Sequence, residues 1–192
     1  MSAEAPEYYL IDFDWDGYTQ WTLGPEAADA MLATWVAQMP ERVNKLLHFL
    51  GTEGVIRTRE RFDADELENL ECFIMQHGDL YQHPQDQDYY LTDFTFELCK
   101  DTAALIGSLC QDRVPDLQWS LNKDRTSQMM YQSIGMNSVI DGDHMPIPHA
   151  VVEFAQEGLR KRRKFLGAFR KQRWGFLTRM MLVISYEQET TS

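Results

Sequence analysis

The chain has 192 residues, 44% hydrophobic and 25% charged, and its 30 acidic and 18 basic residues give a net charge of −12. That length fits one domain, or at most two small ones, and it suffices for a core without disulfide staples. The longest strictly apolar run, Met180 to Ile184, is too short to cross a bilayer, and the first residues carry no secretory pattern. The three cysteines lack zinc-type spacing, which predicts reduced, mostly buried thiols in a cytoplasmic protein.

The first predicted elements are a strand and a long helix. The run from Tyr8 to Phe13 is dense in aromatic and branched residues, which is typical of a strand. Gly24-Pro25 predicts the start of a helix, because proline is well tolerated in a first turn. Apolar residues at helical spacing then continue to Gly51, the expected end, and Pro40 between them predicts a kink or a restart.

Capping residues predict the second helix. Asp63 can accept hydrogen bonds from the first turn, and Glu66, three residues later, can return a bond to the Asp63 backbone. The apolar pattern runs from there to Gly78, where we expect the helix to stop. Residues 79–88 are polar and include a proline, so they are predicted to form a loop.

A third helix and a hairpin follow. The helix is expected from residue 88 or 92 to Asp112, and Gly107 inside it predicts close contact with another element. Residues 117–122 and 128–136 resemble the two strands of a hairpin, because apolar and polar residues alternate in the first of them.

The last predicted helix begins at Pro146 and Pro148, and its apolar stripe reaches Leu177. A strand-like run from Met180 to Tyr186 comes after it. This order of elements predicts the α+β class, with residues 1–192 forming a single domain whose helices pack on a small, mainly antiparallel sheet.

Charge is divided unevenly along the chain. Residues 1–150 carry 26 Asp and Glu against 9 Lys and Arg, whereas residues 151–192 carry 4 against 9. Such a division indicates a contact made through charge, within the protein or with a partner. The basic part of the last helix contains Arg160, Lys161, Arg162, Arg163, Lys164, Arg170, Lys171 and Arg173.

Three interpretations of that basic helix, residues 159–177, remain open. It can pack on the acidic body, with Arg162 and Arg173 in the apolar stripe meeting carboxylates. It can instead bind a protein partner, or it can bind nucleic acid or an acidic membrane through its arginines and aromatic residues.

Asp12, Asp14 and Asp16 alternate along the chain and are followed by Gly17, which is half of the pattern of a calcium-binding loop. The bidentate carboxylate is missing, because Leu23 stands at the twelfth position of that loop. The segment also resembles the opening motif of haloacid dehalogenase-like phosphatases, which would make Asp12 a nucleophile on a divalent cation. The sequence therefore offers a metal-dependent hydrolase as an alternative hypothesis, and otherwise implies no cofactor.

The segment from Leu98 to Leu159 resembles small acidic bacterial proteins of unknown function, several of which are immunity proteins of polymorphic toxins. The resemblance rests on a helix with an inner glycine, the run Val-Pro-Asp-Leu-Gln-Trp, a hairpin and a proline-initiated helix. It implies a non-catalytic protein that neutralises a basic protein partner, such as a toxin domain. The acidic residues expected to make that contact are Asp63, Asp65, Glu66, Glu68, Glu71, Asp86, Asp88 and Asp93.

Overall fold

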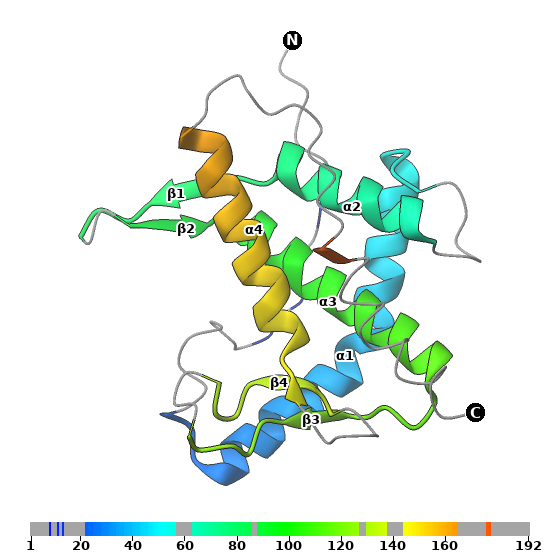
Figure 1. The fold of residues 1–192 in the computed structure, drawn as a ribbon, viewed down its shortest axis with the longest axis vertical. Coiled ribbons are helices and arrows are strands. Elements are labelled where there is room, and N and C mark those ends of the chain that lie inside the picture. The colour runs from blue at the N-terminus through cyan, green and yellow to red at the C-terminus, as the bar shows by residue number, and fades with distance from the viewer. Residues whose placement is uncertain are drawn as a thin grey trace.

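The computed structural model describes residues 8, 11, 13, 22–56, 63–85, 88–126, 130–137, 144–164 and 176–177. The predicted α+β class is confirmed, because helices pack against small antiparallel sheets of two and three strands (Figure 1). One cluster of buried apolar side chains draws on every helix of this part of the chain. The elements are α1 (Pro25–Thr52), α2 (Ala64–His77), β1 (Leu80–Gln82), β2 (Tyr89–Leu91), α3 (Asp93–Arg113), β3 (Trp119–Leu121), β4 (Ile134–Asn137), β5 (His144–Met145) and α4 (Ile147–Lys164).

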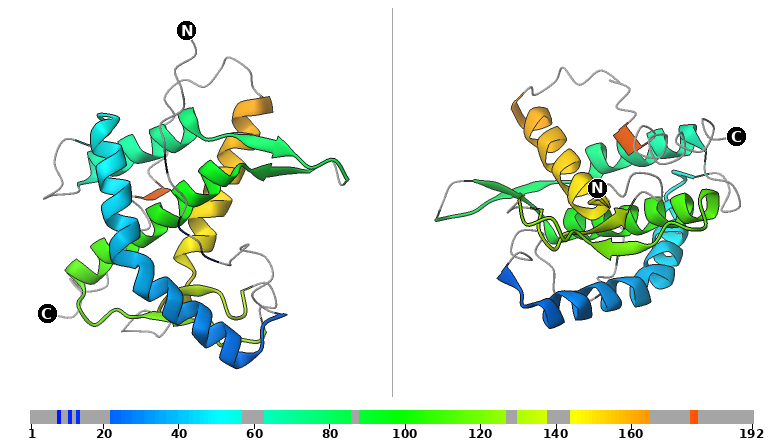
Figure 2. Two further views of the ribbon diagram at one scale, coloured as in Figure 1. Left: turned by 180° about the vertical axis from the view of Figure 1, so that it is seen from behind. Right: turned by 60° about the horizontal axis from the view of Figure 1, so that its bottom comes forward.

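Helix α1 begins at Pro25, as the sequence predicts, and is one helix of 28 residues. Pro40 lies inside it and does not end it, although Figure 2 shows α1 bent near its middle. Bending is the usual result of proline inside a helix, because the ring displaces the preceding turn. The predicted end at Gly51 is wrong by one residue: α1 reaches Thr52, and the glycine with a left-handed backbone is Gly54, whose φ is +68°.

Helix α2 confirms Asp63 as the predicted cap, whereas the predicted return bond from Glu66 stays a prediction. The Asp63 carboxylate accepts hydrogen bonds from the backbone N–H groups of Asp65 and Glu66, at 3.0 and 3.1 Å, and the helix ends before Gly78. The loop predicted for residues 79–88 is wrong, because Leu80–Gln82 pairs with Tyr89–Leu91 in an antiparallel hairpin. These strands have three residues each, which is too short for an alternating pattern to be recognised.

Helix α3 is the central element of the fold. It packs against α1, α2 and α4, and Figures 1 and 2 show α4 on one side of it and α1 on the other. Every residue from 97 to 107 is buried, so this part of the helix has no solvent face. The predicted helix is confirmed with an end one residue later than expected, but its apolar stripe did not indicate that the polar positions of this segment are buried as well.

The hairpin after α3 is confirmed, but its second strand begins at Ile134 and not at residue 128, because residues 130–132 form a turn. A further strand, β5, joins it in the order β3-β4-β5. The close approach predicted at Gly107 is also confirmed. A Cβ atom on Gly107 would lie 2.0 Å from Cζ2 of Trp119, so only glycine allows this strand to pack against α3. Trp119 in turn meets the ring of Trp35 edge to face, which joins β3 to α1.

Helix α4 has the apolar face predicted for it, with Val151, Ala155 and Leu159 buried. The Phe176 ring stacks on Phe154, with their centroids 4.6 Å apart. The two predicted terminal strands lie largely outside the described residues, although Tyr8, Ile11 and Phe13 are described and belong to no strand.

Candidate functional site

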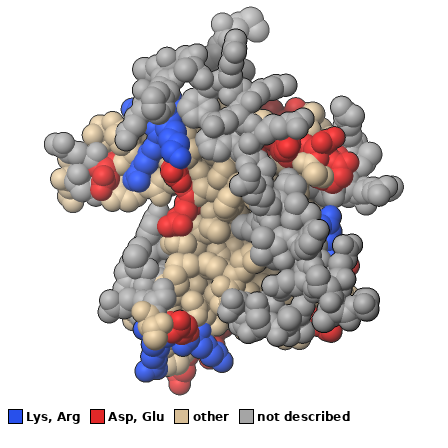
Figure 3. Space-filling model, viewed as in Figure 1, with Lys and Arg blue, Asp and Glu red and all other residues tan. Residues whose placement is uncertain are grey.

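The predicted acidic contact residues occupy different environments. Asp63 and Asp65 are exposed at the start of α2 and Glu68 is half-buried, and Figure 3 shows red side chains gathered in this region. Glu66 and Glu71 are instead 6% and 1% exposed. Their prediction as surface contacts is wrong, because they lie on the inner side of α2, where Glu71 accepts a hydrogen bond from the backbone N–H of Leu177.

The other predicted acidic group does not join the first. Asp88 and Asp93 are exposed, but they lie at the β1–β2 hairpin and the start of α3, at the opposite end of α2 from Asp63 (Figure 1). Asp86 lies outside the described residues. The structure therefore separates the predicted acidic contacts into two groups.

The basic end of α4 is held by backbone oxygens. Arg162 donates to the carbonyl of Met75 and, at 3.1 and 2.8 Å, to those of Gln76 and Gly78, all at the end of α2. A helix C-terminus carries partial negative charge and unsatisfied carbonyls, so a guanidinium is a favourable cap there. The predicted pairing of Arg162 with a carboxylate is thus a minor contact, since Asp79 is 4.0 Å away.

Neighbouring basic residues are used in the same way. Arg160 donates to the carbonyl of Tyr89, Arg163 donates to Leu80 and covers the Tyr89 ring, and Lys161 pairs with Glu157 on its own helix. These contacts favour the first interpretation of the basic helix, packing on the body. Arg170, Lys171 and Arg173 lie outside the described residues, as does the side chain of Lys164.

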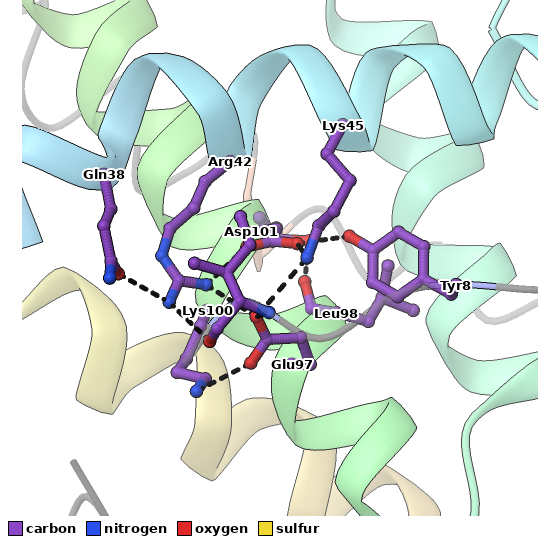
Figure 4. Close-up of polar contacts among 10 residues, drawn as sticks. Tyr8, Gln38, Arg42, Lys45, Glu97, Leu98, Lys100 and Asp101 are labelled. Carbon is purple, nitrogen blue, oxygen red and sulfur yellow. Dashed lines mark hydrogen bonds and ion pairs between the residues drawn. The ribbon is translucent and has the colours of Figure 1, made fainter. Parts of the chain in front are cut away.

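Sequence reasoning missed the main polar feature of the interior, a buried ion cluster between α1 and α3 (Figure 4). It consists of Arg42, Lys45, Glu97, Lys100 and Asp101, none of which is more than 5% exposed. One guanidinium nitrogen of Arg42 lies 2.8 Å from Glu97 and 2.7 Å from Asp101. Lys45 pairs with both carboxylates, and Lys100 pairs with Glu97 at 2.6 Å.

The cluster contains three cations and two carboxylates, so it has one more positive than negative charge. Aromatic rings lie close to the cations. The guanidinium of Arg42 lies 5.5 Å from the ring centroids of both Phe13 and Trp35. Lys45 lies 4.4 Å from the ring centroid of Tyr8, whose hydroxyl donates to Asp101. Such cation–π contacts are strongest at buried sites, and Arg42 and Lys45 are 0% and 5% exposed.

The two carboxylates respond differently to the site. Burial acts to raise the pKa of Glu97, but the hydrogen bond and charge of Lys100 and the charge of Arg42 outweigh it and lower that pKa. For Asp101 burial dominates and raises the pKa, against the opposing effects of Lys45, Tyr8 and Arg42. Burial also raises the pKa of the Tyr8 phenol, so this hydroxyl stays protonated and donates a hydrogen bond to Asp101. The cluster joins the two helices through buried, paired charges, although Nε of Arg42 has no hydrogen-bond partner.

Two further sets of reactive side chains lack catalytic geometry. Ser120, Asn137 and His144 meet on the β3-β4-β5 sheet, but the Ser120 hydroxyl and the Asn137 oxygen both approach the same ring nitrogen, Nδ1, at 3.5 and 2.9 Å. A relay needs the base to use its two nitrogens for different partners, so this is not a nucleophile site. Cys99 and Cys110 are buried free thiols, as predicted, and burial raises the pKa of both, to about 12 for Cys110.

An open pocket of about 360 Å³ lies where α1, α3 and β3 meet. Its lining is mostly apolar on the α1 side and polar on the α3 side, with an indole from β3. The residues are Val36, Met39, Pro40, Val43, Asn44, Ser108, Gln111 and Trp119.

No protein-family model, curated protein or solved structure matches this chain. Among the described residues, no group of three or more His, Cys, Asp and Glu side chains is arranged to hold a metal ion, and Asp12, Asp14 and Asp16 lie outside that part of the chain. In the same part, no helix has the length and apolar character that crossing a membrane requires.

Proposed function

We propose that this protein is a non-catalytic binding protein that receives a basic protein partner on the solvent-facing acidic residues of α1 and α2. The observation that carries this proposal is the direction of the charges on those helices. The basic residues of α1, Arg42 and Lys45, are both buried. The charged residues that α1, α2 and the α2 cap present toward solvent are therefore all acidic: Glu26, Asp29, Glu41, Asp63, Asp65 and Glu68.

A surface of this kind favours association with a basic partner. Complementary charge raises the rate of encounter and excludes partners of the same sign, while a few apolar anchors retain the complex. The resemblance of residues 98–159 to immunity proteins supports an inhibitor that masks a basic toxin domain as the specific form. The contacts that occupy Arg160, Arg162 and Arg163 count against nucleic acid or a membrane as the partner of the basic helix.

The test places the same change of net charge at two different locations. One variant carries Glu41→Lys, Asp65→Lys and Glu68→Lys, and its matched control carries three reversals at the other acidic group and on α4: Asp88→Lys, Asp93→Lys and Glu157→Lys. Association with immobilised polylysine is measured by biolayer interferometry over a range of salt concentrations. We expect the first variant to associate about tenfold more slowly than the control, because steering depends on where the charge lies.

Equal rates for the two variants would show that only net charge matters and that α1 and α2 are not the binding side. Failure of the wild-type protein to bind polylysine at low salt would contradict the proposal as a whole. The alternative of a metal-dependent hydrolase at Asp12, Asp14 and Asp16 stays a prediction. Isothermal titration with calcium, magnesium and manganese tests it, and the absence of heat would remove it.

A further inference from the structure

The open pocket between α1, α3 and β3 has an apolar wall that faces solvent. Val36, on this wall, is 44% exposed, and it is one of two large hydrophobic side chains in the described part of the chain with that degree of exposure. Pro40 and Val43 continue the wall along the same side of α1, at the three- and four-residue spacing that places helix residues next to one another. Apolar concavities that remain open to water are typical positions for an anchoring side chain of a partner.

Pro40 also alters the hydrogen bonding of the helix backbone beside the pocket. In an α-helix the N–H of residue 40 would bond to the carbonyl of residue 36, but Pro40 has no N–H. The carbonyl of Val36 therefore lacks its normal helical donor, and both residues line the pocket.

Three exposed acidic residues stand close in the chain to residues that line the pocket, against one exposed basic residue, Arg113. Glu41 is exposed one turn before Asn44 on α1, and Asp112 is exposed one turn after Ser108 on α3. Asp116 is also exposed, just before β3. An apolar centre with a negatively charged border is complementary to an apolar side chain flanked by lysine or arginine.

We propose that this pocket holds an aliphatic or aromatic anchor of a basic segment in the protein partner, whose flanking cations lie against Glu41 and Asp112. This inference rests on the proposed function and adds to it the position and chemistry of the anchor. The acidic surface brings the partner in, whereas the pocket selects a segment in which an apolar residue stands between basic ones.

The test uses two synthetic peptides, Lys-Lys-Arg-Leu-Phe-Arg-Lys-Lys and the same peptide with Ser-Ser in place of Leu-Phe, labelled for fluorescence anisotropy. We expect the wild-type protein to bind the Leu-Phe peptide at least about tenfold more tightly, which corresponds to burial of one large apolar side chain. Asn44→Trp fills the pocket with an indole and should reduce this preference to about one. Thr34→Trp is the matched control, because Thr34 is exposed on the same helix and does not line the pocket.

Val36→Glu is a second pocket variant, at an exposed position where the helix tolerates the change, and it should also abolish the preference. A preference that survives in both pocket variants, with melting temperatures unchanged, would overturn the pocket as the anchor site. Equal, salt-sensitive binding of the two peptides by the wild type would overturn this inference and leave the proposed function standing. Binding of neither peptide would overturn both.

Discussion

Replacement of Arg42 by methionine tests whether the buried ion cluster holds α1 to α3. The change keeps most of the side-chain volume but removes the guanidinium contacts to Glu97 and Asp101, together with a hydrogen bond to Gln38 at 3.0 Å. The carboxylates then keep their lysine partners, the Tyr8 hydroxyl at Asp101 and the backbone N–H of Ile11 at Glu97, in a buried site. Removing one partner from a buried ionic network costs about 3–5 kcal/mol, which is a large part of the total stability of a typical domain.

The free energy of unfolding is measured by urea denaturation followed by circular dichroism. At roughly 2–4 °C per kcal/mol for a chain of this size, the melting temperature of Arg42→Met should fall by about 6–20 °C. Glu41→Gln, at the adjacent exposed position, is the control and should stay within about 0.5 kcal/mol of the wild type. A loss below about 1 kcal/mol for Arg42→Met would refute the reasoning, since it would mean that the cluster is hydrated in solution.

Three other outcomes follow from the packing. Gly107→Ala should lower the free energy of unfolding by about 1–3 kcal/mol in urea, because its Cβ would meet Trp119 at 2.0 Å; a more stable variant would contradict the close packing. Arg162→Met should lower the free energy of unfolding by about 1–2 kcal/mol, because it removes the guanidinium that caps the end of α2. Lys161→Met removes only a surface pair and should change it by under about 0.5 kcal/mol. Melting temperatures in the opposite order would contradict this assignment. Burial lowers the pKa of His144 below 6.5, so as the pH falls the unfolded chain takes up this proton before the folded chain does, and the folded state loses stability. Between about pH 7 and pH 5 the free energy of unfolding should therefore fall more for the wild type than for His144→Gln. Equal losses would exclude this histidine as a cause.

The sequence predicted those parts of the fold that depend on local chemistry. Asp63 caps α2 through bonds to residues two and three positions away, and Pro25 suits the first turn of α1 through its own ring. Gly107 was recognised because a glycine inside a helix is unfavourable without a packing reason. The β1–β2 hairpin was missed because its strands are three residues long, which is below the length at which a pattern becomes visible.

The interior charges could not be predicted, because their partners are distant in sequence. Arg42 meets Glu97 and Asp101 across 55 and 59 residues, and each of them alone is typical of a solvent-facing helix position. The signal that was available is the position of Arg42 in α1, three residues after buried Met39 and four before buried Leu46. The same limit explains the error at Glu66 and Glu71: a helix rich in carboxylates does not reveal which of them face inward.

The burial of α3 on all sides has a consequence for how this protein opens. A surface helix can lose a turn to solvent while the remainder of the fold stays intact, but residues 97–107 have no side from which water can enter. Their backbone amide hydrogens can therefore exchange with solvent only when α1 and α4 separate from α3, which is unfolding of the whole core. Exchange at these amides reports the global stability directly, and it provides a single internal measure against which any variant or bound partner can be compared.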